Sequence, residues 1–199
     1  MLFRSLAAVA IALVALPLIA IPPQEFALQY RSWLALLAKD AANRGPSVMG
    51  ILYDWFGLAW PNWPVQLAGT IALLCPLALR QERWQDPAFR LLFLCSLLVY
   101  LVIFNHRAES AMFVVATTGV AVWWVTAPRA RHRDVLMALT FLLVSVTSLE
   151  IVPSWVRNQW VTPYDLKAVP CLLAWLVMQA ELLGRTTAAR PASPPPAAG

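Results

Sequence analysis

The chain has 199 residues, of which 60% are hydrophobic and only 13% are charged, and its formal net charge is +5. Soluble domains carry roughly 25% charged residues, so the composition argues against a soluble domain and indicates an integral membrane protein. We assign the positive charge to basic loops facing anionic lipid, which excludes a nucleic-acid surface. Cys75, Cys95 and Cys171 each lie in an apolar run, so the sequence offers no disulfide framework and no metal-ligand spacing.

Apolar segments along the chain predict an all-α fold, a polytopic transmembrane bundle of about six spans. A helix that crosses the hydrocarbon needs about 20 residues. Several segments are shorter, which places the turn after the third at headgroup depth or in a water-filled recess. The first segment also admits a signal-peptide interpretation, although no cleavage motif follows it. The expected spans are Leu6–Ile21, Pro64–Leu79, Leu91–Phe104, Ala111–Thr126, Val135–Val152 and Ala168–Leu183.

The connection between the first two spans has its own organisation. Helical spacing of aromatic and apolar residues predicts an amphipathic helix over Gln24–Lys39, lying on the membrane or packed over the bundle. A turn follows at Asn43–Ser47, and Val48–Trp60 is an apolar segment too short to span. The expected domains are therefore a helical membrane domain over residues 1–185 and a disordered Pro/Ala-rich tail over residues 186–199.

The basic residues predict the orientation of the bundle. They concentrate in two connections, which must lie on the same side of the membrane and which the positive-inside rule places in the cytoplasm together with both termini. The remaining connections then face outward, and the location expected is the bacterial inner (plasma) membrane. We interpret the second cluster as a determinant of topology and not as a site. The two clusters are Arg80, Arg83 and Arg90, then Arg129, Arg131 and Arg133.

One outward connection is unusually charged. His106, Arg107 and Glu109 fall within the turn Asn105–Ser110, between two apolar runs. Ionisable groups close to hydrocarbon are costly, so their presence indicates function. The Arg fork suits phosphate oxygens, and His titrates near physiological pH. An alternative of similar weight is a surface Arg–Glu pair that only caps two helices.

Three segments together resemble glycosyltransferase family 87, whose members are polytopic bacterial membrane enzymes. They are Leu28–Leu37 with its Tyr-x-x-Trp-Leu pattern, Asn43–Leu52, and Phe104–Phe113 with its His-containing outer turn. The resemblance covers roughly residues 10–126. It implies part of a GT-C-type fold and an inverting hexosyltransferase that uses a polyprenyl-phosphate sugar, mannose-like, on the outer face of the inner membrane.

The resemblance also implies the site residues and partners. A donor phosphate and sugar are expected to bind through His106, Arg107, Glu109 and Asn105, joined by Arg44 and Ser47. Cationic donors would stabilise the negative charge that develops on the leaving phosphate. The scheme requires neither a cofactor nor a metal ion. The expected partners are the lipid-linked sugar donor and membrane lipids, with no nucleic acid.

The chain departs from the family pattern in one respect. Such enzymes carry a catalytic acidic residue in a first outer loop, and nothing in this chain corresponds to it. We therefore expect a C-terminal portion, a truncated product or one piece of a split enzyme, inactive alone and completed by an N-terminal partner segment. Asp54 alone is a weak candidate for any role. The alternative function is a non-catalytic integral membrane subunit that binds lipid head groups or another membrane protein.

Overall fold

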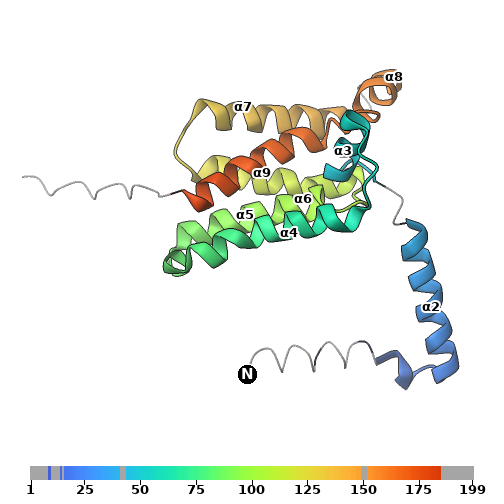
Figure 1. Cartoon of the computed structure of the whole chain (residues 1–199). Coiled ribbons are helices and arrows are strands. Elements are labelled where there is room, and N and C mark those ends of the chain that lie inside the picture. Colours follow the sequence, from blue (N-terminus) through green and yellow to red (C-terminus); the bar gives the residue numbers. More distant parts are fainter. Residues whose placement is uncertain (1–8, 10–13, 15, 41–43, 149–151, 185–199) are drawn as a thin grey trace, which may run out of the picture. The chain divides into compact units, whose positions relative to one another are not determined.

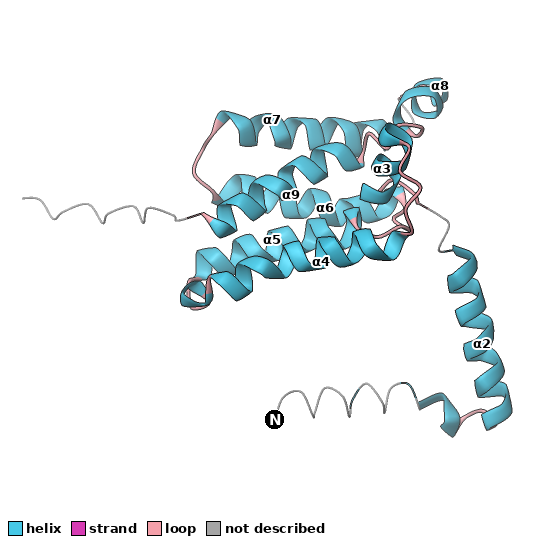
Figure 2. Cartoon of the chain, viewed as in Figure 1, coloured by secondary structure: helices cyan, strands magenta, loops and turns pink. Residues whose placement is uncertain are grey.

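The computed structural model describes residues 9, 14, 16–40, 44–148 and 152–184, and every regular element within them is a helix (Figure 1, Figure 2). The all-α prediction is therefore confirmed for the described residues. Contacts divide the chain into two units, Met1–Ala42 and Asn43–Gly199. Half of the expected first span, Leu6–Ile21, and the whole predicted tail, residues 186–199, lie outside the described residues.

The first unit contains a 3-10 turn, η1 (Leu16–Ile19), and the helix α2 (Pro23–Asp40), which confirms the helix predicted over Gln24–Lys39. Proline at the first helical position, Glu25 in the first turn and Lys39 in the last all favour helix formation there. The aromatic residues share a face as predicted. The ring centroids of Phe26 and Tyr30 are 4.5 Å apart, and those of Tyr30 and Trp33 are 6.3 Å apart.

The second unit is a helical bundle. Figure 1 shows α4 (Asn62–Leu79), α5 (Pro87–Ile103), α6 (Phe113–Thr126), α7 (Arg131–Thr140) and α9 (Ala168–Leu183) alongside one another. Two short helices, α3 (Val48–Phe56) and α8 (Ser154–Val156), lie at one end of the bundle. The core between α5, α6 and α9 buries Val99, Val102, Phe113, Ala116, Val120, Ala174 and Met178.

Close approach of α5 and α6 depends on a small residue. A Cβ atom at Gly119 would lie 2.8 Å from the Cys95 carbonyl oxygen and 3.1 Å from Val99. A methyl group there would therefore push the two helices apart, because the Cys95 oxygen belongs to the backbone and cannot turn away.

Two helices begin earlier than the hydropathy predicts. The span expected from Leu91 begins at Pro87, because Asp86 caps the helix by accepting a hydrogen bond from the Ala88 amide at 2.9 Å. The resulting α5 has 17 residues. The span expected over Val135–Val152 begins at Arg131, and its hydrogen-bond pattern changes at Phe141 to a π-helix, η4 (Phe141–Ser145), then to a 3-10 turn, η5 (Val146–Ser148).

Of the described helices, only α4 has the length and apolarity to cross a membrane, with 18 residues. Shorter apolar helices occupy Pro87–Ile103, Ser110–Thr126 and Ala168–Leu183. The second of these joins a 3-10 turn, η3 (Ser110–Met112), to α6. With α7 and η4 at the span expected over Val135–Val152, helices stand at five of the six expected positions, while six spans are not established.

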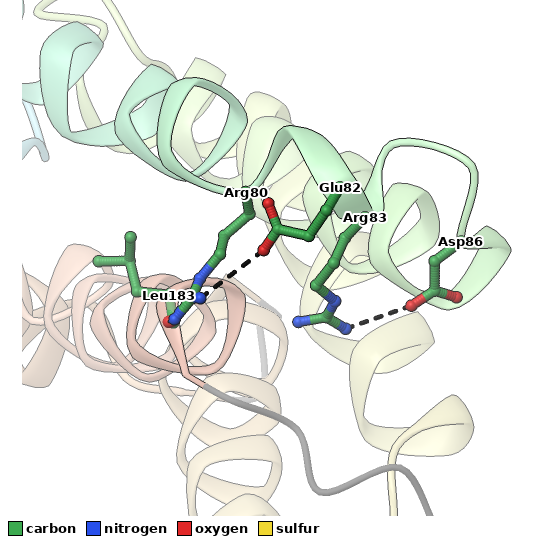
Figure 3. A network of polar contacts seen from close by, with 5 residues as sticks. All are labelled: Arg80, Glu82, Arg83, Asp86 and Leu183. Atoms are coloured by element: carbon green, nitrogen blue, oxygen red, sulfur yellow. Dashed lines mark hydrogen bonds and ion pairs between the residues drawn. The ribbon is translucent and has the colours of Figure 1, made fainter.

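At one end of the bundle, α4, α6 and α9 end and α5 and α7 begin. Basic residues concentrate there, in residues 80–90 and 129–133, and we call this region the basic end. The Arg80 guanidinium donates to the Leu183 carbonyl oxygen at the end of α9, and Arg83 Nη2 lies 3.2 Å from Asp86 Oδ2 (Figure 3). Both groups therefore tie the connection after α4 to neighbouring helix ends.

Arg133 has contacts that the sequence did not predict. It belongs to the cluster interpreted as a topology determinant, yet it is buried, and its Nη2 lies 2.6 Å from Glu181 Oε1. Its guanidinium also stands over the Trp123 ring, 5.3 Å from the centroid. Arg133 is therefore an internal ion-pair partner that links α7 to α9, because its carboxylate partner comes from a distant helix.

Candidate functional site

Two turns that are far apart in the sequence touch at the end of the bundle away from the basic end. A Cβ atom at Gly45 would lie 3.0 Å from the His106 carbonyl oxygen and 3.5 Å from that of Ala108. Gly45 has φ +47°, a conformation that favours glycine. We call this region the polar end and define it as residues 44–47, 105–110 and 157–167. The structure thus brings the turn that follows Arg44 against the Asn105–Ser110 turn.

Ser47 and Arg44 have defined contacts within the first turn. Ser47 is fully buried, its hydroxyl donates to the Arg44 carbonyl oxygen at 2.5 Å, and it accepts from the Gly50 amide at 3.3 Å. Ser47 is therefore the N-cap of α3. The Arg44 guanidinium carbon lies 4.2 Å from the centroid of the Tyr53 ring, a cation–π contact.

The charged turn is held by its own side chains and by α4. Asn105 Oδ1 accepts from the Arg107 amide at 3.0 Å, which closes the turn. Gln66 Nε2 donates to the Phe104 carbonyl oxygen at 3.0 Å and lies 3.1 Å from His106 Nδ1. Because the Phe104 oxygen can only accept, the amide nitrogen faces this turn and Nδ1 accepts its second proton. The neutral imidazole then carries its hydrogen on Nε2.

The residues of the Asn105–Ser110 turn differ in how far their side chains are exposed. Arg107 and Glu109 are exposed and His106 is half-buried, while Ala108 between them is buried. The exposed groups are placed to meet a ligand from outside the bundle.

Sequence reasoning missed Gln66, although one signal was present: Gln66 and Thr70 put two polar groups one turn apart in an apolar span.

A pair of carboxyl groups lies beside the first turn. Asp165 is buried, and a Cβ atom at Gly50 would lie only 1.9 Å from its Oδ2. Burial first, and then the negative charge and hydrogen bonding of Asp54, raise the pKa of Asp165 to about 7. Oδ2 is shielded from water with no hydrogen-bond donor among the described residues. A proton shared with Asp54 supplies that missing donor, since two ionised carboxylates can only accept.

Sequence reasoning missed Asp165 and gave Asp54 only as a weak candidate for any role, not as the catalytic base. Asp165 stands in the turn before α9, while Asp54 belongs to α3, so their proximity is a tertiary property. The available signal was an acid placed directly before an apolar helix.

Two cations occupy the same end. Lys167 is buried, and its Nζ donates to Ser110 Oγ at 3.0 Å. Burial, and after it the positive charge of Arg157, lower the pKa of Lys167. Lys167 therefore places a cationic donor beside Ser110, and Arg157 is near enough to affect it.

A groove of about 500 Å³ begins at Ser110 and runs along α6 beside η4. The side chains that line it are small or apolar, and the polar groups among them are hydroxyls. The groove therefore has the character of a site for a hydrocarbon chain, with the Lys167–Ser110 hydrogen bond at one end. Its lining residues are Ser110, Ala111, Val114, Thr117, Thr118, Ala121, Val122, Val144 and Ser145.

No family model, no curated protein and no solved structure matches the chain. The resemblance to glycosyltransferase family 87 therefore stays a prediction.

Proposed function

We propose that this chain is a helical membrane protein whose polar end binds the phosphate of a lipid-linked sugar and serves as the donor-binding part of a glycosyltransferase. One observation carries the proposal: the Lys167–Ser110 hydrogen bond stands where the groove along α6 begins. A polyprenyl-phosphate sugar combines the same two chemistries, an anionic head and a long apolar chain.

The membrane setting is supported by the outer surface of the bundle. Only 28% of the apolar 18-residue window of α4 is buried, so α4 is unlike the buried core helix of a soluble protein. Large apolar side chains point outward from several helices, with exposed fractions of 62% for Ile71, 67% for Val114 and 71% for Val125. Such surface is stable against lipid. We propose a bundle of about six spans with the basic end in the cytoplasm.

The head group would be held by cations and neutral donors together. The phosphate would lie near Lys167, which donates to Ser110 where the groove begins, with the positive charge of Arg157 close by. His106 contributes its Nε2–H, since Gln66 occupies Nδ1. Arg107 offers a guanidinium fork on the exposed side of the turn. The hydrocarbon chain would follow the groove along α6.

The carboxyl pair supplies the acid–base group for sugar transfer. In an inverting reaction a base takes the proton of the acceptor hydroxyl as that oxygen bonds to the anomeric carbon. The bond from this carbon to the donor phosphate breaks, and the lipid phosphate leaves with the electron pair. A carboxyl group that titrates near pH 7 suits the first role. Lys167, His106 and Arg107 would stabilise the leaving phosphate.

The test is binding of a polyprenyl-phosphate sugar to the purified full chain in detergent. Lys167→Gln and His106→Gln each remove one phosphate contact, so we expect each to weaken binding about tenfold. Arg90→Gln is the matched control, because it removes a charge from an exposed position at the basic end and should leave binding unchanged.

Transfer is measured separately with the same donor and a hydroxyl acceptor. Loss of transfer in Asp165→Asn with donor binding retained would support the catalytic role of the pair. Donor binding without any transfer would favour the non-catalytic membrane subunit or a part that needs its N-terminal partner segment. Equal affinity in all variants would refute the proposed site.

A further inference from the structure

A cavity of about 410 Å³ opens at the basic end, separate from the groove along α6. It lies where the first turns of α5 meet the last turns of α6 and α9. Its apolar lining includes Leu91, Leu92 and Trp123, and its charged lining is Arg83, Arg133 and Glu181. A ligand that fits must therefore have both an anionic and an apolar part.

The two guanidinium groups of this cavity differ in their contacts. Arg133 is committed to Glu181 and to the Pro128 carbonyl oxygen. Arg83 bonds Asp86 through Nη2, but its Nη1 is shielded from water and has no hydrogen-bond partner among the described residues. A donor left in this state is costly. A small rotation of the Arg83 side chain, which lines the cavity, would bring this nitrogen to an acceptor bound there.

We propose that the cavity binds the phosphate of an anionic phospholipid through Arg83. The first methylene groups of the lipid would pack on Leu91 and Leu92. Exposed arginines at the same end, Arg129 and Arg131, attract anionic lipid to this surface. The guanidinium fork matches phosphate oxygens. The inference rests on the membrane setting proposed above and is independent of sugar transfer.

The test compares how well the purified full chain retains phosphatidylglycerol and phosphatidylcholine. Both lipids are offered in mixed micelles, and the lipid that stays bound is measured by native mass spectrometry. We expect phosphatidylglycerol to be retained preferentially and Arg83→Gln to weaken its retention about tenfold, the effect of one charge-assisted hydrogen bond. Arg90→Gln removes the same charge from an exposed neighbouring position and should leave retention unchanged. Ala88→Leu keeps every charge but fills the cavity that Ala88 lines, so it should also lower retention.

Three results would overturn the proposal. Equal losses in Arg83→Gln and Arg90→Gln would mean general charge attraction, and equal retention of both lipids would mean that the phosphate charge is not recognised. Displacement of the lipid by inorganic phosphate would identify a free-phosphate site. If Arg83→Gln fails to fold, Ala88→Leu decides the matter: undiminished retention in it also refutes the site.

Discussion

Asp165 combines burial, a left-handed backbone and an acidic neighbour in one residue. Its φ is +49°, a region that asparagine and aspartate tolerate better than most residues. Its carboxylate lies against Gly50, where no side chain competes for the space. The protonated form is therefore favoured in the folded protein, because burial and Asp54 both oppose a second negative charge.

This raised pKa predicts how stability depends on pH. The folded-state pKa of about 7 lies above the ordinary value of 3.8. The stabilising contribution of the proton is complete below about pH 4 and is lost as pH rises to about 7. A tenfold difference in proton affinity between the folded and unfolded states corresponds to about 1.4 kcal/mol. We expect Asp165→Asn to raise the unfolding temperature at pH 8 and to remove this pH dependence, as thermal unfolding in detergent would show.

Asp54→Asn is the control for this prediction. It removes the neighbouring charge but leaves Asp165 buried, so the pH dependence should shrink without disappearing, since burial is the larger cause. A pH profile unchanged in Asp165→Asn would contradict the assignment.

Helices of the second unit are joined by a few polar contacts placed in apolar surroundings. Gln179 of α9 and Ser96 of α5 are hydrogen-bonded at 2.6 Å, and both are buried. At the basic end Arg133 and Glu181 join α7 to α9. Such contacts fix which helix faces meet, because an unpaired polar group in the same place would be costly.

The Arg133–Glu181 pair gives a prediction for these helices. Arg133→Met leaves the partly buried Glu181 carboxylate without its cationic partner and with the Trp123 Nε1–H as a remaining donor, so we expect a loss of about 3 kcal/mol in the free energy of unfolding. Replacing both residues by Met should cost less than the sum of the single changes, which a double-mutant cycle in urea or guanidinium would measure.

The pair Arg83–Asp86 is the comparison, because each side chain is more exposed than its counterpart: 21% against 11% for the arginines and 39% against 24% for the acids. Asp86→Asn keeps the helix cap and should cost less than about 1 kcal/mol. Additive effects in the Arg133–Glu181 cycle would show that the two groups do not interact.

In the second unit as a whole, different charged groups lie at the two ends of the bundle. The polar end holds His106, Lys167 and Asp165, with Asp54 of α3 beside it, and the basic end holds the two arginine-rich connections. Between them the helices present apolar surface outward. This distribution is the one expected of a bundle whose two ends meet water and whose middle meets lipid.

We expect the polar end and the basic end to lie on opposite sides of the membrane. Glu109→Cys and Arg131→Cys place a thiol at an exposed position of the polar and the basic end, respectively. If the bundle spans the membrane, a membrane-impermeant maleimide should label the first variant in intact cells and the second only after permeabilisation. The unmodified chain is the control, because Cys95 and Cys171 are buried and Cys75 is half-buried. Labelling of both variants from one side would contradict a spanning bundle.

Local signals in the sequence were enough to place several helices. Apolar composition predicted both ends of α9, Ala168–Leu183, and aromatic spacing predicted α2 to within one residue at either end. Hydropathy alone placed the start of α5 four residues late, because the Asp86–Pro87 cap lies outside the apolar run. The resemblance placed Arg44 and the His106 turn in one site, and the structure brings their turns into contact.

The helical class, the apolar segments and the charged turn can be read from the amino-acid sequence, because helix propensity, capping and hydropathy act between neighbouring residues. The partners of the polar groups are instead a product of tertiary packing. Asp54 meets Asp165, Gln66 meets His106, Ser110 meets Lys167 and Arg133 meets Glu181 across 40 or more residues of sequence. No local pattern encodes these contacts, since they depend on which helix faces pack together.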